Sequence, residues 1–587
     1  MRMHSLNSDC GEKVISVSTE RSALLESEGH ILVLGGPGSG KTTIAIKKAE
    51  REISSGFLKS GQRILFLSFA RATVARVAEK SRCLIQSEDR QRLEINTYHG
   101  FAWNLLRSHG YLLRVGKPIA LLPPPEAASR LAEIPSAMRD TEKQRLFDVE
   151  GLLHFDLFAR ITAGLLSRSQ SLATIISDAY PIIILDEFQD TNSDEWALIQ
   201  TLGKRSYLIA LADPEQRIYE FRGADPRRIG EFLATYSPRQ FDFGSENHRS
   251  TGTDILVFGN DLLSGVNKSK TYKDVAVTRY GFYRGRSQHF FVKAAVLEAI
   301  TRRKKHGPAE WSLAVLVSAK RMMLAVSDYL LMQTDRLPVI HHDVALDAEG
   351  PSLSASLIAG LLEGANDSDT IARRLLLDLC SHMRGRSGNN APPTATLEIV
   401  SALSAFIESG KIRGKNRKQL VTDAQQIADK RLRLKFSGDP GDDWLLVRSF
   451  LSEASSEHFK QVAEDAKYLR LLRKGAALRA RLGELWRSKD GYDGATLAVR
   501  DALLQEHFSV ATSHWTGVHV MTIHKAKGKE FDEVIIYEGT HQGRIVRQNA
   551  TESDVAQARL SLRVAITRAR LRTTILTPKN DACPFLC

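Results

Sequence analysis

Long apolar runs, paired cysteines and Cys/His clusters are all missing from this sequence. No apolar run approaches the ~18 residues that a membrane-spanning helix needs, and the N-terminal MRMHSLNSDCGEK has no apolar segment of a secretory signal. The five cysteines form no CxxC pair and no zinc-type spacing with histidine. We therefore expect a cytoplasmic protein with free thiols, no zinc site and no membrane contact.

Composition narrows the class of protein further. The 587 residues, 43% hydrophobic and 25% charged, are typical of globular domains and predict roughly three or four of them. Lys and Arg (81) outnumber Asp and Glu (68), which gives a net charge of +13. This excess favours a polyanion such as nucleic acid as partner, but charge alone does not establish one.

The stretch ILVLGGPGSGKTTIAI, residues 31–46, has the spacing G-x-x-x-x-G-K-T of a phosphate-binding loop. Ile31–Leu34 predicts a buried parallel strand, and Lys41 opens the following helix. Lys41 would reach the β- and γ-phosphates of a nucleoside triphosphate, and Thr42 would bind Mg²⁺. The predicted nucleotide-binding residues are Gly35, Gly36, Pro37, Gly38, Ser39, Gly40, Lys41, Thr42 and Thr43.

A pair of acids follows another apolar run, Ile182–Leu185. Acids at the carboxyl end of a parallel strand face the ligand site of an open α/β sheet. Asp186 is the predicted Mg²⁺ ligand, and Glu187 is the predicted general base that polarises the attacking water.

Strand and helix patterns alternate through two parts of the chain, which predicts α/β cores with parallel sheets. Each core is interrupted by a segment of helical composition. The predicted boundaries are 1–110 and 176–239 for the first core, 111–175 for its helical insertion, 240–364 and 513–587 for the second core, and 365–512 for the second helical insertion.

Further sequence blocks follow the phosphate loop along the chain. DEFQDTN, QRIYEFRGA, NHRS, TIHKAKGKEF and VAITRAR follow the phosphate loop in family order, from residue 31 to about 577. On these blocks the chain resembles the UvrD/Rep group of superfamily 1A DNA helicases. The resemblance implies two RecA-like P-loop NTPase cores, ATP and Mg²⁺ as cofactors, and 3′–5′ translocation on single-stranded DNA with separation of 3′-tailed duplex.

The resemblance also implies roles for single residues of the ATP site. Gln189 and Gln216 resemble glutamines that couple the γ-phosphate to the DNA side. Arg249 and Arg568 resemble the two arginines that the second core presents to the γ-phosphate. Glu530 resembles a ribose-binding glutamate, and Gly528 keeps its turn tight. The implied catalytic set is Lys41, Glu187, Gln216, Arg249 and Arg568.

The DNA side is implied by aromatic, hydroxyl and basic residues in the same blocks, because bases stack on rings and hydroxyls hold phosphates. Phe69 and Tyr98 can equally be core aromatics, and Phe221 stands where the family usually has Trp. Basic runs at 301–306, 411–418 and 429–435 fit either a phosphate backbone or solvated helix faces. The candidate DNA contacts are Phe69, Thr97, Tyr98, His99, Tyr219, Phe221, Arg222, Thr522 and His524.

Three positions depart from the family pattern. Glu20 stands where a glutamine normally reads adenine, and an ionised carboxylate cannot donate to the base. His248 replaces a Tyr that stacks on the base, and Arg563 replaces a Tyr in the last block. We therefore expect GTP or CTP to compete with ATP if these positions contact the base.

Two functions follow from the sequence. The first is a DNA-stimulated motor that unwinds duplex DNA. The second is an ATP-gated regulatory subunit that acts with a separate nuclease. The chain ends about ten residues beyond its last predicted strand, with no nuclease domain expected. This compact layout resembles the helicase half of two-gene anti-phage systems such as Gabija. Repair and defence both stay open.

Overall fold

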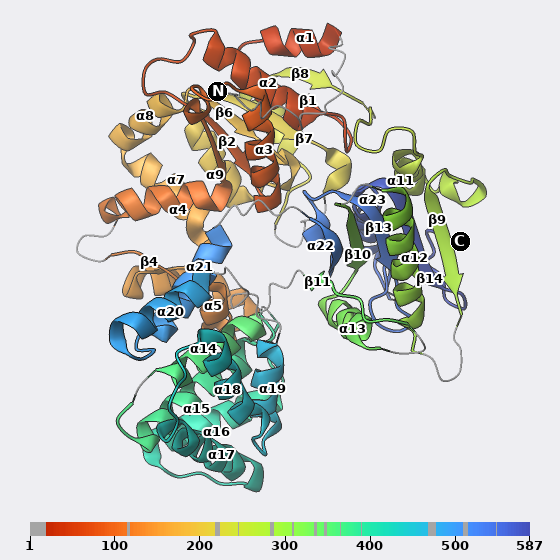
Figure 1. Cartoon of the computed structure of the whole chain (residues 1–587). Helices are drawn as coiled ribbons and strands as arrows, with labels where there is room; N and C mark the ends of the chain where they lie inside the picture. The colour runs from red at the N-terminus through yellow and green to blue at the C-terminus, as the bar shows by residue number, and fades with distance from the viewer. Residues whose placement is uncertain are drawn as a thin grey trace, which may run out of the picture. The chain divides into compact units, whose positions relative to one another are not determined.

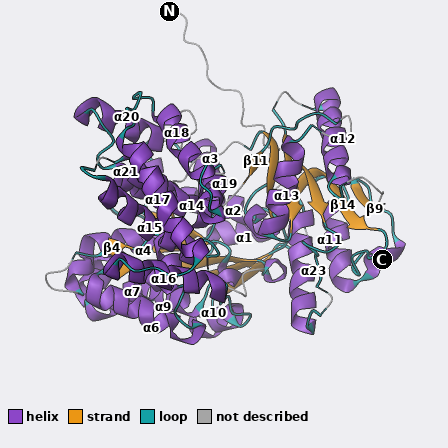
Figure 2. Cartoon of the chain, turned by 90° about the horizontal axis from the view of Figure 1, so that it is seen from below, coloured by secondary structure: helices purple, strands orange, loops and turns teal. Residues whose placement is uncertain are grey.

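The computed structural model divides the chain into two compact units (Figures 1 and 2). The first comprises Met1–Asn104, Ala159–Ala345 and Val510–Cys587, and the second comprises Leu105–Phe158 and Leu346–Ser509. The residues that the structure describes are 19–113, 118–217, 223–244, 246–281, 287–307, 310–333, 337–344, 349–363, 365–388, 390–467, 477–508, 515–547 and 549–586.

The first unit contains a parallel six-stranded sheet in the order β3-β2-β6-β7-β1-β8. Helices α1, α2 and α3 pack on one face through a shared apolar core. Strands buried on both faces read as continuous apolar runs, as in the IIIL of β6. The strands are Ile31–Leu34 (β1), Ile64–Ser68 (β2), Leu93–Thr97 (β3), Ile182–Leu185 (β6), Tyr207–Ala212 (β7) and Arg239–Asp242 (β8). The helices are Thr19–Glu26 (α1), Lys41–Ser54 (α2), Arg71–Leu84 (α3), Tyr98–His109 (α4), Phe158–Arg168 (α7), Gln170–Ala179 (α8), Ser193–Leu202 (α9) and Arg228–Tyr236 (α10).

A second parallel sheet in the same unit has the order β11-β12-β10-β13-β14-β9. Every residue of its central strand β10 is buried, as a sheet covered by helices on both faces requires. The strands are Val275–Tyr280 (β9), Ser312–Val317 (β10), Asp343–Val344 (β11), Gly517–Thr522 (β12), Phe531–Tyr537 (β13) and Ala569–Pro578 (β14). The helices are Ile255–Ser264 (α11), Phe290–His306 (α12), Lys320–Leu331 (α13), Ile523–Ala526 (α22) and Glu552–Ile566 (α23). The predicted pair of parallel α/β cores is confirmed.

One predicted boundary falls inside a strand. β8, Arg239–Asp242, pairs in parallel with β1 and belongs to the first sheet, so the first core extends beyond residue 239. The sequence RQFD gives little sign of this, because β8 is an edge strand and only Phe241 of its four residues is buried. The predicted start of the second core at residue 240 is wrong for that reason.

The second unit is mainly helical and is formed by Leu105–Phe158 and Leu346–Ser509. The predicted insertions 111–175 and 365–512 differ from these segments: residues 159–175 belong to the first unit, and the helix Glu349–Leu362, predicted in the second core, belongs to the second unit. Helix α5 of the first segment packs on α14 and α15 of the second, around an apolar core supplied by α14–α21. A two-stranded sheet pairs Ala120–Leu121 (β4) with Leu152–Leu153 (β5). The helices are Pro124–Leu131 (α5), Arg139–Arg145 (α6), Glu349–Leu362 (α14), Ser368–Gly385 (α15), Thr394–Ser409 (α16), Lys415–Leu432 (α17), Pro440–Ser452 (α18), Glu457–Ala466 (α19), Ala477–Lys489 (α20) and Ala495–Phe508 (α21).

The structure bears on two expectations from the sequence, the lack of membrane-spanning helices and the free cysteine thiols. A search of its helices found none with the length and apolar character needed to cross a membrane. The cysteines it includes, Cys83, Cys380 and Cys583, are free thiols.

Candidate nucleotide site

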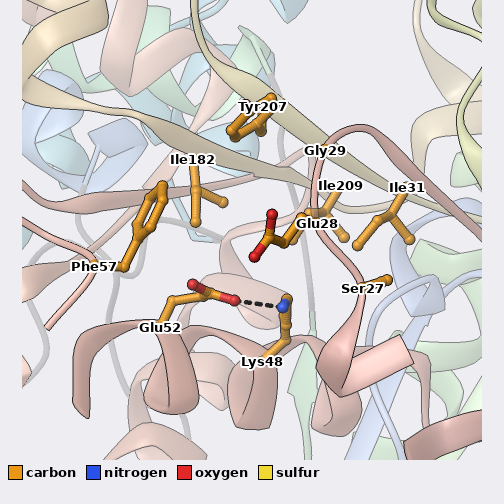
Figure 3. Close-up of a pocket in the computed structure, with 10 residues that line it drawn as sticks. All are labelled: Ser27, Glu28, Gly29, Ile31, Lys48, Glu52, Phe57, Ile182, Tyr207 and Ile209. Atoms are coloured by element: carbon orange, nitrogen blue, oxygen red, sulfur yellow. Dashed lines mark hydrogen bonds and ion pairs between the residues drawn. The ribbon is translucent and has the colours of Figure 1, made fainter. Parts of the chain in front are cut away.

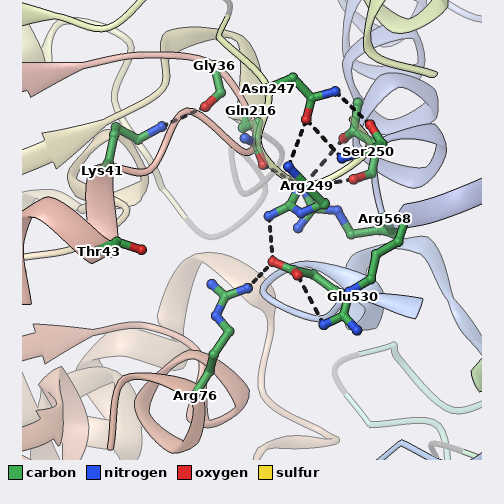
Figure 4. Close-up of polar contacts among 12 residues, drawn as sticks. Gly36, Lys41, Thr43, Arg76, Gln216, Asn247, Arg249, Ser250, Glu530 and Arg568 are labelled. Atoms are coloured by element: carbon green, nitrogen blue, oxygen red, sulfur yellow. Dashed lines mark hydrogen bonds and ion pairs between the residues drawn. The ribbon is translucent and has the colours of Figure 1, made fainter. Parts of the chain in front are cut away.

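The loop between β1 and α2 has the geometry of a phosphate cradle. Gly38 and Gly40 adopt φ angles of +80° and +88°, which favour glycine. Lys41 donates a hydrogen bond to the Gly36 carbonyl at 3.1 Å (Figure 4). The buried Ser39 hydroxyl has no hydrogen-bond partner among the described residues. An unpaired buried hydroxyl in a loop whose glycines have positive φ suits a ligand rich in oxygen atoms.

The two threonines at the start of α2, Thr42 and Thr43, have different environments. Thr42 lies in the first turn of α2 and is partly buried, next to Lys41. Thr43 is buried, and its hydroxyl accepts a hydrogen bond from Lys80 Nζ at 3.1 Å. Thr43 therefore already has a protein partner.

Asp186 and Glu187 follow β6 at the carboxyl edge of the first sheet. Ser68 at the end of β2 donates a hydrogen bond to Asp186 Oδ2 at 3.2 Å. Glu187 has a φ of +53°, in the left-handed region that a non-glycine residue rarely adopts. Such strain costs about 1–3 kcal/mol, and it occurs preferentially at functional sites.

A continuous series of hydrogen bonds leads from Glu187 to the second core. Gln189 donates to Glu187 Oε2 at 2.6 Å and accepts from the Asp213 backbone N–H at 3.0 Å. Gln216 donates to Asp213 Oδ2 at 2.7 Å. Arg568 of the second core then donates to Gln216 Oε1 at 2.9 Å. The structure thus brings four of the predicted site residues into one connected network.

Glu530 is the centre of a cluster of arginines (Figure 4). Arg249 donates to Glu530 Oε1 at 2.8 Å and to the Thr567 carbonyl at 3.0 Å. Arg76 of α3 forms an ion pair with the same carboxylate, and Arg570 lies 3.4 Å from its other oxygen. The predicted ribose ligand and a predicted γ-phosphate arginine are therefore direct neighbours.

Burial lowers the pKa values of two cations of the site, Lys41 and Arg568. Burial lowers the pKa of Lys41, although Asp213 and Glu187 oppose the shift. Burial and the charge of Arg249 lower the pKa of Arg568 to about 9. A bound triphosphate would counter both shifts, because its negative charge favours the protonated cations.

The two acids differ from each other in the same environment. Burial and the neighbouring Glu187 raise the pKa of Asp186 to about 7. Burial also acts to raise the pKa of Glu187, but Lys527 and Lys41 outweigh it and the net shift is downward. Glu187 is therefore the more readily ionised acid, as a base requires.

Glu530 has a strongly lowered pKa. Burial acts to raise it, but the charges of Arg249, Arg76 and Arg570 outweigh burial. The arginine cluster therefore contains an ionised carboxylate at neutral pH.

The segment before the loop contributes an arginine that sequence reasoning missed. Arg21 is buried and donates to the Ser39 carbonyl at 3.1 Å and to Glu246 Oε2 at 2.6 Å. His248 Nε2 lies 3.3 Å from the same guanidinium. Glu20 accepts a hydrogen bond from the Asp242 backbone N–H at 3.1 Å. His248 thus lies beside the phosphate loop, where its backbone N–H donates to the Gly38 carbonyl at 2.9 Å, whereas Glu20 is held at the end of β8.

The third departure from the family pattern has a clear partner. Arg563 is buried, forms an ion pair with Glu215 at 2.6 Å and donates to Asn260 Oδ1 at 2.9 Å. Glu215 belongs to the 3-10 turn Pro214–Gln216 of the first core. Arg563 therefore fixes the turn that carries Gln216.

The candidate DNA contacts of the first core differ in accessibility. Tyr98 is only 3% exposed, and its ring stacks on Phe69 with centroids 4.5 Å apart. Phe69 is partly exposed, as is Thr97, whose hydroxyl accepts from Gly100 N–H at 2.9 Å. Tyr98 supports the Phe69 ring, which leaves Phe69 as the aromatic surface available for stacking.

Of the remaining candidate DNA-contacting residues, three lie within the described residues and three lie outside them. His99 is the second residue of α4 and is partly buried. Thr522 ends β12, and His524 follows it in α22, where burial lowers its pKa. Tyr219, Phe221 and Arg222 lie outside the described residues.

Other residues of the site that were not predicted from sequence include Arg76, Asp190, Asp213 and Lys527. Asp190 and Lys527 stand inside the blocks DEFQDTN and TIHKAKGKEF, so their positions were a usable signal. Arg76 has no such signal, because its role depends on the approach of α3 to Glu530.

A pocket on the first core lies away from this site (Figure 3). Its lining includes Ile31, Ile182 and Tyr207, which begin β1, β6 and β7, whereas the phosphate loop follows the other end of β1. The buried Lys48 in its lining pairs with the partly buried Glu52. This pocket is therefore not the nucleotide site.

Metal binding by protein groups alone is not indicated. The described residues contain no group of three or more His, Cys, Asp or Glu that could hold a metal ion. An ion that uses one carboxylate, one hydroxyl and phosphate oxygens needs no such group, and Mg²⁺ commonly binds in this way.

Comparison with known proteins gives consistent results across the chain. The family model of the UvrD/REP helicase N-terminal domain matches residues 17–148 and 126–237, and that of the UvrD-like helicase C-terminal domain matches 487–580. A "Probable DNA helicase II homolog" of Rickettsia conorii is 22% identical over 94% of this chain and 90% of its own length. DNA helicase II of Rickettsia typhi is 21% identical, with 97% and 91% covered. The ATP-dependent DNA helicase PcrA of Staphylococcus aureus is 20% identical, with 94% and 82% covered.

Proposed function

The chain belongs to the UvrD-like helicase family and is an ATP-dependent DNA helicase, and we propose that it translocates 3′ to 5′ on single-stranded DNA. Its substrate would be a 3′-tailed duplex, which it separates ahead of the translocating strand. The direction is the one that the family resemblance implies. The observation that supports an ATP-driven motor is the hydrogen-bonded series from Glu187 through Gln216 to Arg568. That series joins the predicted base of the first core to an arginine of the second.

Mg²⁺ would be held by the Asp186 carboxylate and the Thr42 hydroxyl, together with nucleotide phosphates. The bound ion would neutralise phosphate charge and favour the ionised form of Asp186. Lys41 orients the β- and γ-phosphates from the loop. Glu187 accepts a proton from the attacking water, since its pKa is already lowered.

The second core would complete the site only when it approaches the first. Arg568 and Arg249 then face the γ-phosphate, where their planar, positively charged groups pair with its oxygens. Hydrolysis removes that phosphate and weakens the contact between the cores. Alternating approach and release converts each ATP cycle into a step along the strand.

The decisive experiment measures strand displacement on 3′-tailed and 5′-tailed duplexes, with ATP and Mg²⁺, for the wild type and Lys41→Ala. We expect displacement of the 3′-tailed duplex only. Lys41→Ala should lose hydrolysis by about 10²–10³-fold or more, as when one transition-state donor is removed, and should lose unwinding with it. Normal unwinding by this variant would contradict the proposal.

The alternative regulatory role predicts another outcome. Slow hydrolysis without displacement, both alone and with the product of the neighbouring gene, would favour an ATP-gated subunit beside a separate nuclease. The relatives reported above are named as helicases. The link to Gabija-type defence therefore has no support beyond the compact layout.

A further inference from the structure

Lys527 connects the second core to three acceptors of the first. It follows α22, and its side chain is only 2% exposed. Its ammonium donates to the Gln216 carbonyl at 2.6 Å, pairs with Asp190 and lies 3.9 Å from Glu187 Oε2. The ammonium group has three N–H donors. All three can therefore point toward the hydrolytic machinery of the other core.

Stability alone is a poor explanation for this arrangement. The Asp190 side chain is 1% exposed, so both members of the pair have left water. A pair as buried as this often contributes no more than apolar residues of similar volume would. The placement of the ammonium gives it a second role, because it fixes the backbone at Gln216 and faces the carboxylate of Glu187.

The position of Lys527 in the chain links it to the DNA side. Thr522 and His524, two candidate DNA contacts, stand five and three residues before it. The short helix α22, Ile523–Ala526, lies between Thr522 and Lys527. A shift of this helix on DNA binding would therefore move the ammonium relative to Gln216.

We propose that Lys527 is a positioning residue that transmits DNA binding to ATP hydrolysis. It holds Gln216 and Glu187 in place from the second core, through Asp190 and the Gln216 carbonyl. This inference rests on the proposed DNA contacts of Thr522 and His524. We expect Lys527 to affect kcat and to leave KM for ATP nearly unchanged. Its side chain contacts protein groups, whereas Lys41 and the phosphate loop would contact the nucleotide.

The test compares Lys527→Met with Lys529→Met in steady-state ATP hydrolysis, with and without saturating single-stranded DNA. Lys529 is a matched control, since its ammonium lies over the Trp515 ring of its own core. We expect Lys527→Met to lower DNA-stimulated kcat about 10²-fold, the cost of misplacing catalytic groups by about 1 Å, with KM for ATP changed much less. Lys527→Arg should recover part of the loss, because a guanidinium also pairs with Asp190. A kcat within 2-fold of wild type for Lys527→Met would overturn the proposal.

A double variant separates positioning from folding. Lys527→Met removes the buried cation that pairs with Asp190 and leaves the Asp190 charge buried, which destabilises the protein. Adding Asp190→Asn removes that charge and should recover most of the thermal midpoint. DNA-stimulated kcat should stay low in the double variant, since the ammonium is still missing. Recovery of kcat together with the midpoint would show a purely structural role and overturn the proposal.

The same assays distinguish this inference from the proposed function. A wild type that hydrolyses ATP with DNA stimulation but separates no duplex would contradict the strand-separation proposal alone. The kcat losses of the Lys527 variants would still be measurable there, and they would decide the role of Lys527 independently.

Discussion

The two sheets of the first unit share an architecture but present opposite ends to each other. The first sheet contributes carboxyl ends, with Asp186 and Glu187 directly after β6. The second contributes amino ends, since Glu530 directly precedes β13 and Arg568 directly precedes β14. The Phe531 N–H donates to the Arg568 carbonyl at 2.9 Å, which holds these two amino ends together.

The two ends also differ in charge. Acids predominate on the first, with Asp213 after β7 adding to the pair after β6, whereas Arg249, Arg568 and Arg570 of the second core lie around Glu530. The rule that ligands bind at carboxyl ends of parallel strands thus describes only the first sheet. In the proposed function, the repeated fold therefore supplies two complementary halves of one site.

The largest expected effect tests the cationic half. Arg568→Ala should lower kcat of DNA-stimulated ATP hydrolysis about 10³-fold or more, as loss of comparable arginines does in other phosphoryl-transfer sites. Arg570→Ala is the control, because that side chain is 49% exposed and its pairing is worth little. Similar losses for both variants, measured in one steady-state assay, would mean that the amino end acts only as a diffuse positive surface.

The next effect concerns Glu530, the carboxylate that several of these arginines share. Glu530→Gln leaves three arginines without their shared carboxylate and should lower the free energy of unfolding by about 2–3 kcal/mol. The pKa of Glu530 is held below its ordinary 4.5. Its stabilisation is therefore complete above pH about 4.5 and is lost as the pH falls through the lower folded value.

Denaturation with urea at several pH values checks this prediction. The difference between wild type and Glu530→Gln should be constant from about pH 5 to 7 and should shrink in acid. The exposed Glu552 at the start of α23 provides the control variant Glu552→Gln. A difference that is absent at pH 7 would rule out the arginine cluster as a stabilising contact.

A smaller effect separates two aromatics at the first sheet. Phe69→Ala should weaken binding of single-stranded DNA by about 1–3 kcal/mol, the value of one base stacked on a ring. Tyr98→Phe should change affinity less than about 2-fold, since Tyr98 is buried beneath that ring. Fluorescence anisotropy with a labelled oligonucleotide at fixed salt measures both variants. Equal weakening would place Tyr98 in contact with DNA.

The smallest effect concerns base selectivity at the first core. Glu20→Gln restores a side chain that can both donate and accept, and one added hydrogen bond is worth about 1 kcal/mol. We expect the ratio of kcat/KM for ATP over GTP to rise about 5-fold. An unchanged ratio would mean that the Asp242 backbone N–H keeps Glu20 away from the base.

Features encoded locally were predicted well from sequence. Ile31–Leu34 and Ile182–Leu185 were correct as strands because both are continuous apolar runs that end in a glycine loop or an acid pair. The start of α2 at Lys41 follows from the loop spacing. In such segments, the residues adjacent in sequence are sufficient to predict the strand or the helix start.

Features that depend on contacts between distant segments were not predicted. Arg76 and Glu530 are separated by 454 positions, and nothing near Arg76 indicates the pairing. Lys527 was inside a recognised block, yet its partners Asp190 and Gln216 belong to the other core. The edge strand β8 was assigned to the wrong core because its pairing with β1, rather than its own sequence, defines it.

Gly528 sets how closely the two cores can approach. Its φ is +76°, and a Cβ there would meet Thr73 Oγ1 at 2.7 Å and Ala70 Cβ at 3.1 Å. Both neighbours stand at the start of α3 in the first core. Any larger residue at this position would act as a spacer, widening the gap that the arginines must cross. The reach of the second core's cations therefore depends on a single missing methyl group.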